Sequence, residues 1–110
     1  MLKIPINCGH KNSIFTSNSH TLYLTKYDDG RFEYYGKITI PGGEGNAKVN
    51  HPFTPIFVVA MGSNFFSNTN NNIVSASANT MEARVDVMTN TGLVPQRDAV
   101  VNLFVKGTWK

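Results

Sequence analysis

The stretch TLYLTKYDDGRFEYYGKITI, residues 21–40, decides the fold class, because it contains one strand pattern before a tight turn and another after it. Residues 21–27 are rich in Thr and Tyr, which favour strands, and residues 31–40 have a similar composition. Between them lies Asp-Asp-Gly at 28–30, where Gly tolerates a positive φ and Asp bonds the local backbone. The sequence therefore predicts a β-hairpin over residues 21–40.

Further strand patterns follow the hairpin and are separated by clusters of Gly, Pro and Asn. Residues 80–89 alternate apolar and polar side chains, which is typical of a half-exposed strand. The run IFVVAM at 56–61 is the most apolar and predicts a strand buried on both faces. The remaining predicted strands are 47–50, 73–78 and 99–109, and the predicted loops are 41–46, 62–72 and 90–98. We therefore expect an all-β, antiparallel β-sandwich of about seven or more short strands, without long helices.

The composition supports one all-β domain. The chain has 110 residues, of which 41% are hydrophobic and only 15% charged, and it contains 13 Asn, 10 Thr and 7 Ser. Asn, Ser and Thr compete with the backbone for hydrogen bonds and disfavour helix interiors. We expect residues 1–20 to be a lead-in or connector and residues 21–110 to form the β-sandwich domain.

The predicted core consists of apolar side chains from the strands at 31–40, 56–61, 80–89 and 99–109. These residues are Phe32, Ile38, Ile40, Phe57, Val59, Val85, Val87, Val101 and Leu103.

No residue pattern indicates catalysis, a cofactor or a metal ion. Asp28 and Asp29 belong to a turn, where Asp is common for backbone reasons. Cys8 and His10 offer two metal ligands without the rest of a site. The Gly-rich segment 41–45 precedes a strand pattern and not the helix that a phosphate-binding loop requires. We therefore expect a non-enzymatic protein without cofactors.

The charge pattern gives no sign of nucleic-acid binding, and no segment is long and apolar enough to be inserted in a membrane as a helix. The formal net charge is +3 and the isoelectric point is near 9.2, but the Lys and Arg residues are scattered singly. The N-terminal residues lack the apolar stretch of a secretory signal, so we expect synthesis in a cytoplasm. The single cysteine, Cys8, excludes an intrachain disulfide.

Four motifs occur in a fixed order along the chain: the Asp29-Gly30 turn, the aromatic-Gly pair Tyr35-Gly36, the segment Pro-Phe-Thr-Pro at 52–55, and the apolar stretch VNLFVKGTW at 101–109. In this order they resemble the C-terminal receptor-binding tips of bacteriophage tail fibres and of fibres of phage-tail-like bacteriocins. The family more often has Trp where this chain has Tyr35.

The resemblance implies a homotrimeric tip at the end of a virion fibre, joined to an upstream fibre shaft or another virion protein. It also implies host recognition, in which exposed loops bind a bacterial surface glycan such as lipopolysaccharide or capsule without cleaving it. Two alternatives stay open: a structural cap or joint without receptor binding, and part of a glycan-degrading tailspike.

The candidate glycan-contact surface is the loop SNFFSNTNNN at 63–72, because aromatic rings cover the apolar faces of sugars and Asn offers both donors and acceptors. The alternative is that Phe65 enters the core and that the Asn run is a plain solvated loop. The candidate residues, with two tyrosines of the hairpin, are Asn64, Phe65, Phe66, Asn68, Asn70, Asn71, Asn72, Tyr34 and Tyr35.

Overall fold

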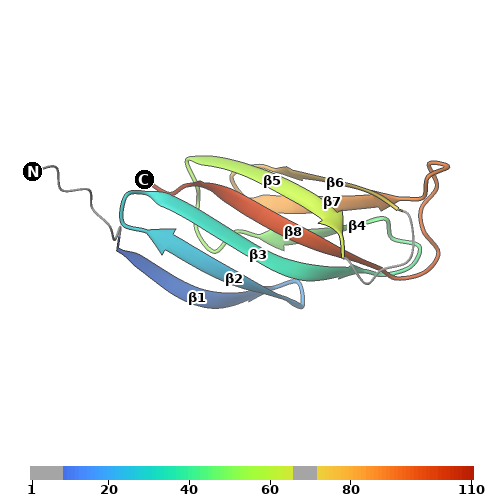
Figure 1. The fold of residues 1–110 in the computed structure, drawn as a ribbon, viewed down its shortest axis with the longest axis horizontal. Helices are drawn as coiled ribbons and strands as arrows, with labels where there is room; N and C mark the ends of the chain where they lie inside the picture. Colours follow the sequence, from blue (N-terminus) through green and yellow to red (C-terminus); the bar gives the residue numbers. More distant parts are fainter. Residues whose placement is uncertain (1–8, 66–71) are drawn as a thin grey trace, which may run out of the picture.

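The computed structural model describes residues 9–65 and 72–110, which form eight strands and no helix (Figure 1). The strands are β1 (His10–Ser17), β2 (His20–Tyr27), β3 (Arg31–Ile40), β4 (Asn46–Asn50), β5 (Phe57–Asn64), β6 (Ile73–Ala78), β7 (Glu82–Met88) and β8 (Ala99–Thr108). Accordingly, the described residues contain no helix that could span a membrane.

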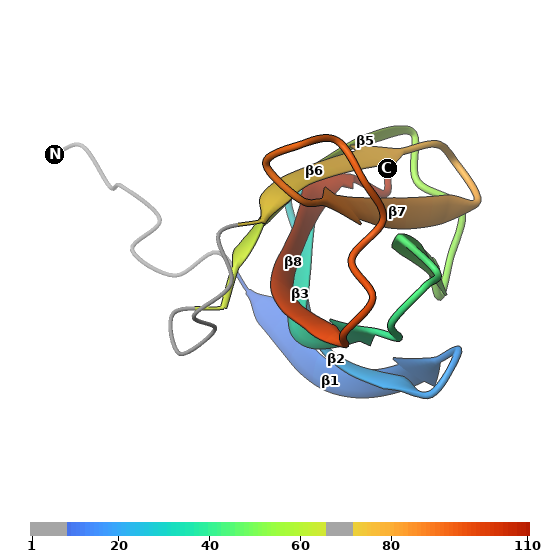
Figure 2. The ribbon, with the colours of Figure 1, turned by 90° about the vertical axis from the view of Figure 1, so that its right-hand side faces the viewer.

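The strands build two antiparallel sheets that pack face to face. The larger sheet has the order β1-β2-β3-β8-β5 and the smaller one the order β4-β7-β6. Seen from one end, the larger sheet curves around the smaller one (Figure 2). The prediction of an all-β antiparallel sandwich is therefore confirmed.

The predicted β2–β3 hairpin is present, and its turn is held by the side chain of Asp29. The carboxylate of Asp29 accepts hydrogen bonds from the backbone N–H of Arg31 at 3.0 Å and from its Nε at 2.7 Å. Gly30 has a φ of 101°, a conformation that costs other residues strain. The turn residues therefore act structurally, as the sequence indicated.

The described chain enters and leaves the sandwich beside this same turn (Figure 1). The carbonyl oxygen of Gly9 accepts a hydrogen bond from the N–H of Asp28 at 2.7 Å. The N–H of Trp109 donates to the carbonyl oxygen of Gly30 at 2.8 Å. The indole Nε1 of Trp109 also donates to the carbonyl oxygens of Tyr27 and Arg31, both at 3.1 Å.

The core lies between the two sheets and contains most of the predicted residues. Those confirmed as buried are Phe32, Ile38, Ile40, Val85, Val87, Val101 and Leu103. The buried residues that the sequence prediction did not include are Leu22, Leu24, Tyr34, Val49, Ala83, Ala99 and Val105. No polar or charged residue other than Tyr34 is buried among the residues described.

The apolar run at 56–61 is not buried on both faces, and the prediction that Phe57 and Val59 belong to the core is wrong. Phe57 is 59% exposed and Val59 is half-buried. The reason is that β5 is the edge strand of the larger sheet, and only its inward-facing residues, such as Val58 and Ala60, pack against the core. The strand also continues to Asn64, into the predicted loop.

Strand β1 lies within the stretch that the sequence assigned to a connector. It pairs with β2 along its whole length, from His10 opposite Tyr27 to Ser17 opposite His20. Phe15 is its one side chain that packs against the core. The sandwich therefore begins before residue 21.

Candidate functional site

The ends of the predicted contact loop are tied together, while Phe66, Asn68, Asn70 and Asn71 lie outside the described residues. Asn64 Nδ2 donates a hydrogen bond to the carbonyl oxygen of Asn72 at 2.7 Å. The N–H of Phe65 donates to the carbonyl oxygen of Val100, on β8, at 3.2 Å. Asn64, Phe65 and Asn72 are all half-buried, so these three residues anchor the loop to the sandwich.

Tyr34 and Tyr35, the two candidate tyrosines, face opposite sides of the larger sheet. Tyr34 is fully buried, and burial raises the pKa of its hydroxyl. Its prediction as a glycan contact is therefore wrong, because strand alternation turns it into the core. Tyr35 is 54% exposed on the outer face and stacks on Tyr23, with ring centroids 5.5 Å apart.

Tyr23 and Tyr35 belong to a line of apolar side chains that crosses the outer face of the larger sheet. The strand register places one such residue on each of the five strands: Ile14, Tyr23, Tyr35, Phe104 and Met61. We call this set the apolar row. Four of its members are between 47% and 65% exposed, which is unusual for neighbouring large apolar side chains.

Lys37 connects this outer face to the predicted contact loop. It lies on β3, two residues beyond Tyr35, and its Nζ is 5.2 Å from the centre of the Phe65 ring. Asn102, opposite Lys37 on β8, donates hydrogen bonds to Ser63 Oγ and to the carbonyl oxygen of Asn64, both at 3.3 Å. The start of the loop therefore packs on the outer face beside Lys37.

A cleft opens where β2 separates from β3. The two strands pair only from Tyr23 to Lys26, whereas β3 stays paired with β8 as far as Ile40. The turn between β1 and β2, and the residues beside it, contact β4 instead of β3. There Asn18 Nδ2 donates to the carbonyl oxygen of Lys48 at 2.8 Å, and Ser17 Oγ accepts from the N–H of Asn50 at 2.9 Å.

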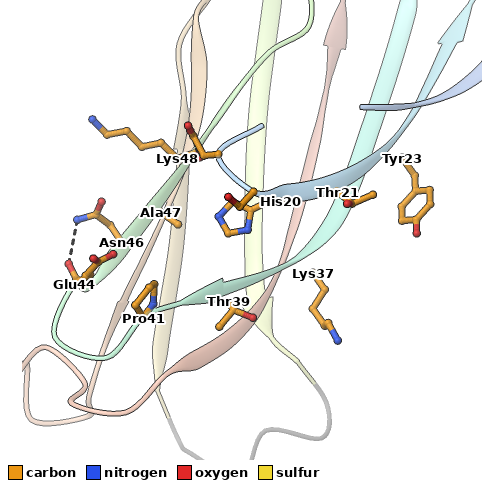
Figure 3. A pocket seen from close by; sticks show the side chains of 12 residues that line it. His20, Thr21, Tyr23, Lys37, Thr39, Pro41, Glu44, Asn46, Ala47 and Lys48 are labelled. Atoms are coloured by element: carbon orange, nitrogen blue, oxygen red, sulfur yellow. Dashed lines mark hydrogen bonds between the residues drawn. The ribbon is translucent and has the colours of Figure 1, made fainter. Parts of the chain in front are cut away.

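The cleft has a volume of about 860 Å³, and most of the residues that line it carry polar side chains (Figure 3). The residues come from the β1–β2 turn, β2, β3, the turn after β3, and β4; they are Asn18, Ser19, His20, Thr21, Tyr23, Lys37, Thr39, Pro41, Glu44, Asn46, Ala47 and Lys48. The side chain of His20 lies in the middle of this set, between β3 and β4 (Figure 3). Burial lowers the pKa of His20, so its imidazole is neutral at pH 7.

The edge of β4 adds backbone groups to this cleft. The carbonyl oxygen of Gly45 accepts a hydrogen bond from the N–H of Val87 at 2.9 Å. Because every second residue of an antiparallel strand bonds to its partner strand, this hydrogen bond shows which residues of β4 bond to β7. The backbone groups of Asn46 and Lys48 therefore point away from β7, toward the cleft. Of these, the carbonyl oxygen of Lys48 is taken by Asn18.

Neither a metal centre nor a pair of facing carboxylates lies in the cleft. Residues 9–65 and 72–110 contain no group of three or more His, Cys, Asp or Glu side chains placed to hold a metal ion. His10 lies against the ring of Tyr27, with centroids 5.9 Å apart, and Cys8 is outside the described residues. Glu44 is the one carboxylate among the cleft residues. The cleft is suited to binding through hydroxyl, amide and ammonium groups.

Sequence reasoning named Tyr35 and both ends of the loop, which lie on or beside the outer face of the larger sheet, and it did not predict the cleft. Thr21, Thr39 and Asn46 are ordinary strand or turn residues in the sequence. They come together only because β2 leaves β3 and approaches β4. The Asn18-Ser19 pair was the available signal, since both residues adopt a positive φ and form the tight turn that carries Asn18 to β4.

No family model matches the chain, and no curated protein matches its sequence. Two solved structures are similar in fold, both at 16% sequence identity and both over 90% of this chain. One is an N-truncated R2-type pyocin tail fibre, with a TM-score of 0.56, and the other is a C-terminal fragment of the P. aeruginosa R2 pyocin fibre, with a TM-score of 0.54. The match covers 37% of the first of these chains and 26% of the second. This chain therefore corresponds to only part of each of the two solved structures. The sandwich described here therefore shares its fold with one part of the R2 pyocin tail fibre.

Proposed function

We propose that this chain is a domain of a bacteriophage tail fibre, or of a phage-tail-like bacteriocin fibre, and that it attaches the particle to bacterial surface polysaccharide. The shared fold with pyocin tail fibres and the order of the sequence motifs support a place in the virion. The cleft between β2, β3 and β4 is the observation that carries the binding function.

The lining of the cleft suits a sugar. Its hydroxyl and amide groups, on Thr21, Thr39 and Asn46, can exchange hydrogen bonds with sugar hydroxyls. Tyr23, which stacks on Tyr35, lies at the margin where this lining meets the apolar row. The volume of about 860 Å³ lies within the range of about 300–1,000 Å³ common for ligand pockets. With Glu44 as its single carboxylate, the cleft lacks the second carboxyl that glycoside hydrolysis ordinarily uses, which supports binding without cleavage.

The loop at 63–72 belongs to the same proposed contact surface. Phe65 lies against Lys37, and Lys37 lines the cleft. A polysaccharide chain that extends from the cleft over Lys37 would therefore meet the start of this loop. The contribution of the Asn residues in the loop stays a prediction.

The apolar row supports a homotrimer as the working form of the domain. Five neighbouring apolar side chains, from Ile14 on β1 to Met61 on β5, would bury substantial apolar surface against other copies of the chain. Three cleft copies in one particle would also strengthen weak binding to a repeating polysaccharide through effective concentration.

The same row favours the alternative function, a structural joint without receptor binding. An exposed apolar surface fits another virion protein, such as an upstream fibre shaft, as well as it fits a second copy. The two functions differ in whether the cleft or only the apolar row is needed.

The test is adsorption of the purified chain to a panel of bacterial strains. We expect saturable binding to some strains, competition by lipopolysaccharide or capsule isolated from those strains, and recovery of that polysaccharide at its original length. Asn46→Ala and Thr39→Ala should weaken adsorption, whereas Met81→Ala, at a residue 74% exposed and outside the cleft lining, should not. A chain that binds no strain but forms a stable complex with another virion protein would establish the structural function instead.

A further inference from the structure

We infer that the polysaccharide taken by the cleft is anionic, so that its sugars carry carboxylate or phosphate groups. The inference rests on the proposed binding function and adds the chemical class of the ligand. It is carried by two lysines on opposite rims of the cleft, Lys37 on β3 and Lys48 on β4 (Figure 3).

Among the residues that the structure describes, Lys37 has no carboxylate partner. Among residues 9–65 and 72–110, no Asp or Glu oxygen lies within 4.0 Å of its Nζ, and its recorded neighbour is the ring of Phe65 at 5.2 Å. An aromatic ring attracts the ammonium without using its N–H donors in the way a carboxylate does. The ammonium group of Lys37 therefore lies at the cleft with N–H groups that can donate hydrogen bonds to an anionic ligand.

Lys48 is held only loosely by protein carboxylates. Its Nζ lies 3.8 Å from Glu82 Oε2, near the limit for an ion pair, and both side chains are partly exposed, at 51% and 27%. Such exposed and long pairs contribute little stability. A ligand carboxylate or phosphate can therefore replace Glu82 at small cost.

The other titratable groups of the cleft do not cancel these two charges. His20 lies between the rims and is neutral at pH 7 because burial lowers its pKa. Glu44 is the single opposing charge among the lining residues and lies in the turn after β3, where its N–H donates to the carbonyl oxygen of Pro41. The lining therefore carries two positive charges against one negative charge, in a chain of formal net charge +3.

The separation of the two lysines also favours a chain with repeated charges over a single small anion. Lys37 and Lys48 lie on opposite sides of the cleft in Figure 3, and His20 lies between them, with the hydroxyl groups of Thr21 and Thr39 nearby. A polysaccharide that crosses the cleft can place hydroxyls in the middle and one anionic group at each rim.

The experiment compares three immobilised polysaccharides of similar length: polygalacturonate as the carboxylate probe, phosphomannan as the phosphate probe, and dextran as the neutral probe. Binding of the full chain is measured at low and at high salt by biolayer interferometry. We expect binding to at least one anionic probe at least tenfold tighter than to dextran, and we expect salt to weaken it, because exposed charge pairs are screened. The probe that binds better identifies the anionic group.

Matched charge variants locate the effect. Lys37→Gln and Lys48→Gln should each weaken binding to the preferred anionic probe about fivefold, the size expected for an exposed ion pair. Glu44→Gln should strengthen it. Lys11→Gln, on an exposed residue of β1 outside the cleft lining, removes the same charge and should leave binding unchanged.

The results separate this inference from the proposed function. Equal, salt-insensitive binding to dextran and to the anionic probes would overturn the anionic ligand while leaving polysaccharide binding in place. If Lys11→Gln lost as much binding to the preferred anionic probe as Lys37→Gln and Lys48→Gln, the anionic groups would not be bound at the cleft. If the chain bound none of the probes and no bacterial strain, the proposed function and the inference would both fall.

Discussion

The hydroxyl of Tyr34 lies 2.6 Å from Nδ1 of His51, and Nε2 of the same imidazole lies 2.8 Å from the carbonyl oxygen of Asn79. A carbonyl oxygen only accepts, so Nε2 carries the ring hydrogen and Nδ1 accepts from the Tyr34 hydroxyl. The imidazole thus connects the core of the larger sheet to the turn before β7. It also satisfies the one phenol buried in the described core.

Tyr34→Phe should destabilise the fold. The substitution removes a buried hydroxyl and leaves His51 Nδ1 without its donor, which should lower the free energy of unfolding by about 1–2 kcal/mol. Tyr35→Phe is the matched control, because the exposed hydroxyl of Tyr35 should contribute less than about 0.5 kcal/mol. Urea denaturation of both variants measures the difference, and equal stabilities would contradict the structural role of the Tyr34–His51 hydrogen bond.

Stability should fall as the pH drops below the ordinary pKa of histidine. Burial lowers the pKa of His51 below its usual 6.5, against smaller opposing effects of Asn79 and Glu82, and burial also lowers the pKa of His20. The unfolded chain therefore binds more protons than the folded chain, so the contribution of neutral histidine is complete above about pH 6.5, the pKa of histidine in the unfolded chain, and is lost as the pH falls below that value and through the lower pKa of the folded state.

Urea denaturation at pH 7.5 and pH 5.5 tests this dependence. His51→Gln should show a smaller loss of stability between the two pH values than the unchanged chain, because the contribution of the neutral His51 imidazole is then absent from both measurements. A loss of the same size in both proteins would show that His51 is not the group responsible.

Phe57→Ala should cost little, in contrast to the same truncation in the core. Phe57 is 59% exposed on the edge strand β5, so we expect a loss of less than about 1 kcal/mol under conditions where the chain is monomeric. Ile38→Ala, at a residue with 0% exposure, should cost about 2–5 kcal/mol. Denaturation midpoints that rank the two variants in the reverse order would contradict the arrangement of β5.

Tyr35→Glu should separate the copies of the proposed homotrimer. The new carboxylate would sit in the middle of the apolar row, between Tyr23 and Phe104, where association would have to remove it from water. Light scattering coupled to gel filtration should then give the mass of a monomer. Leu93→Glu introduces the same charge at an apolar residue that is 66% exposed and lies off the row, and this control should stay trimeric.

Local sequence patterns predicted the hairpin and much of the inner face of the core, but they missed β1 and predicted the wrong burial for β5, the two edge strands of the larger sheet. β1 contains mostly polar residues because both of its faces are largely exposed, so no apolar alternation marks it. In β5 the apolar outer residues Phe57 and Met61 hid the alternation, because β5 lies at an edge and contributes Met61 to the apolar row. An apolar strand sequence therefore does not tell whether its side chains lie in the core or in a row on the outer face of the sheet.

The candidate site depended on long-range geometry and was therefore less predictable. Tyr35 and Phe65 were found from their residue types, but the exposure of Tyr35 and the burial of Tyr34 follow from which face of β3 meets the smaller sheet. The apolar row requires the register of four strand pairs, and the cleft requires the separation of β2 from β3. Neither the apolar row nor the cleft can be predicted from the spacing of residues within a single strand.

The meeting of Gly9 and Trp109 at the turn around Gly30 has a consequence for protein engineering. A unit whose entry and exit points are adjacent can be grafted into a surface loop of an unrelated scaffold without forcing the two sides of that loop apart. The turns at 41–46 and 90–98, at the other end of the strands in Figure 1, would then project away from the scaffold. The sandwich is thus suited to use as an exchangeable cassette, whose projecting turns can be varied in sequence while the junction stays the same.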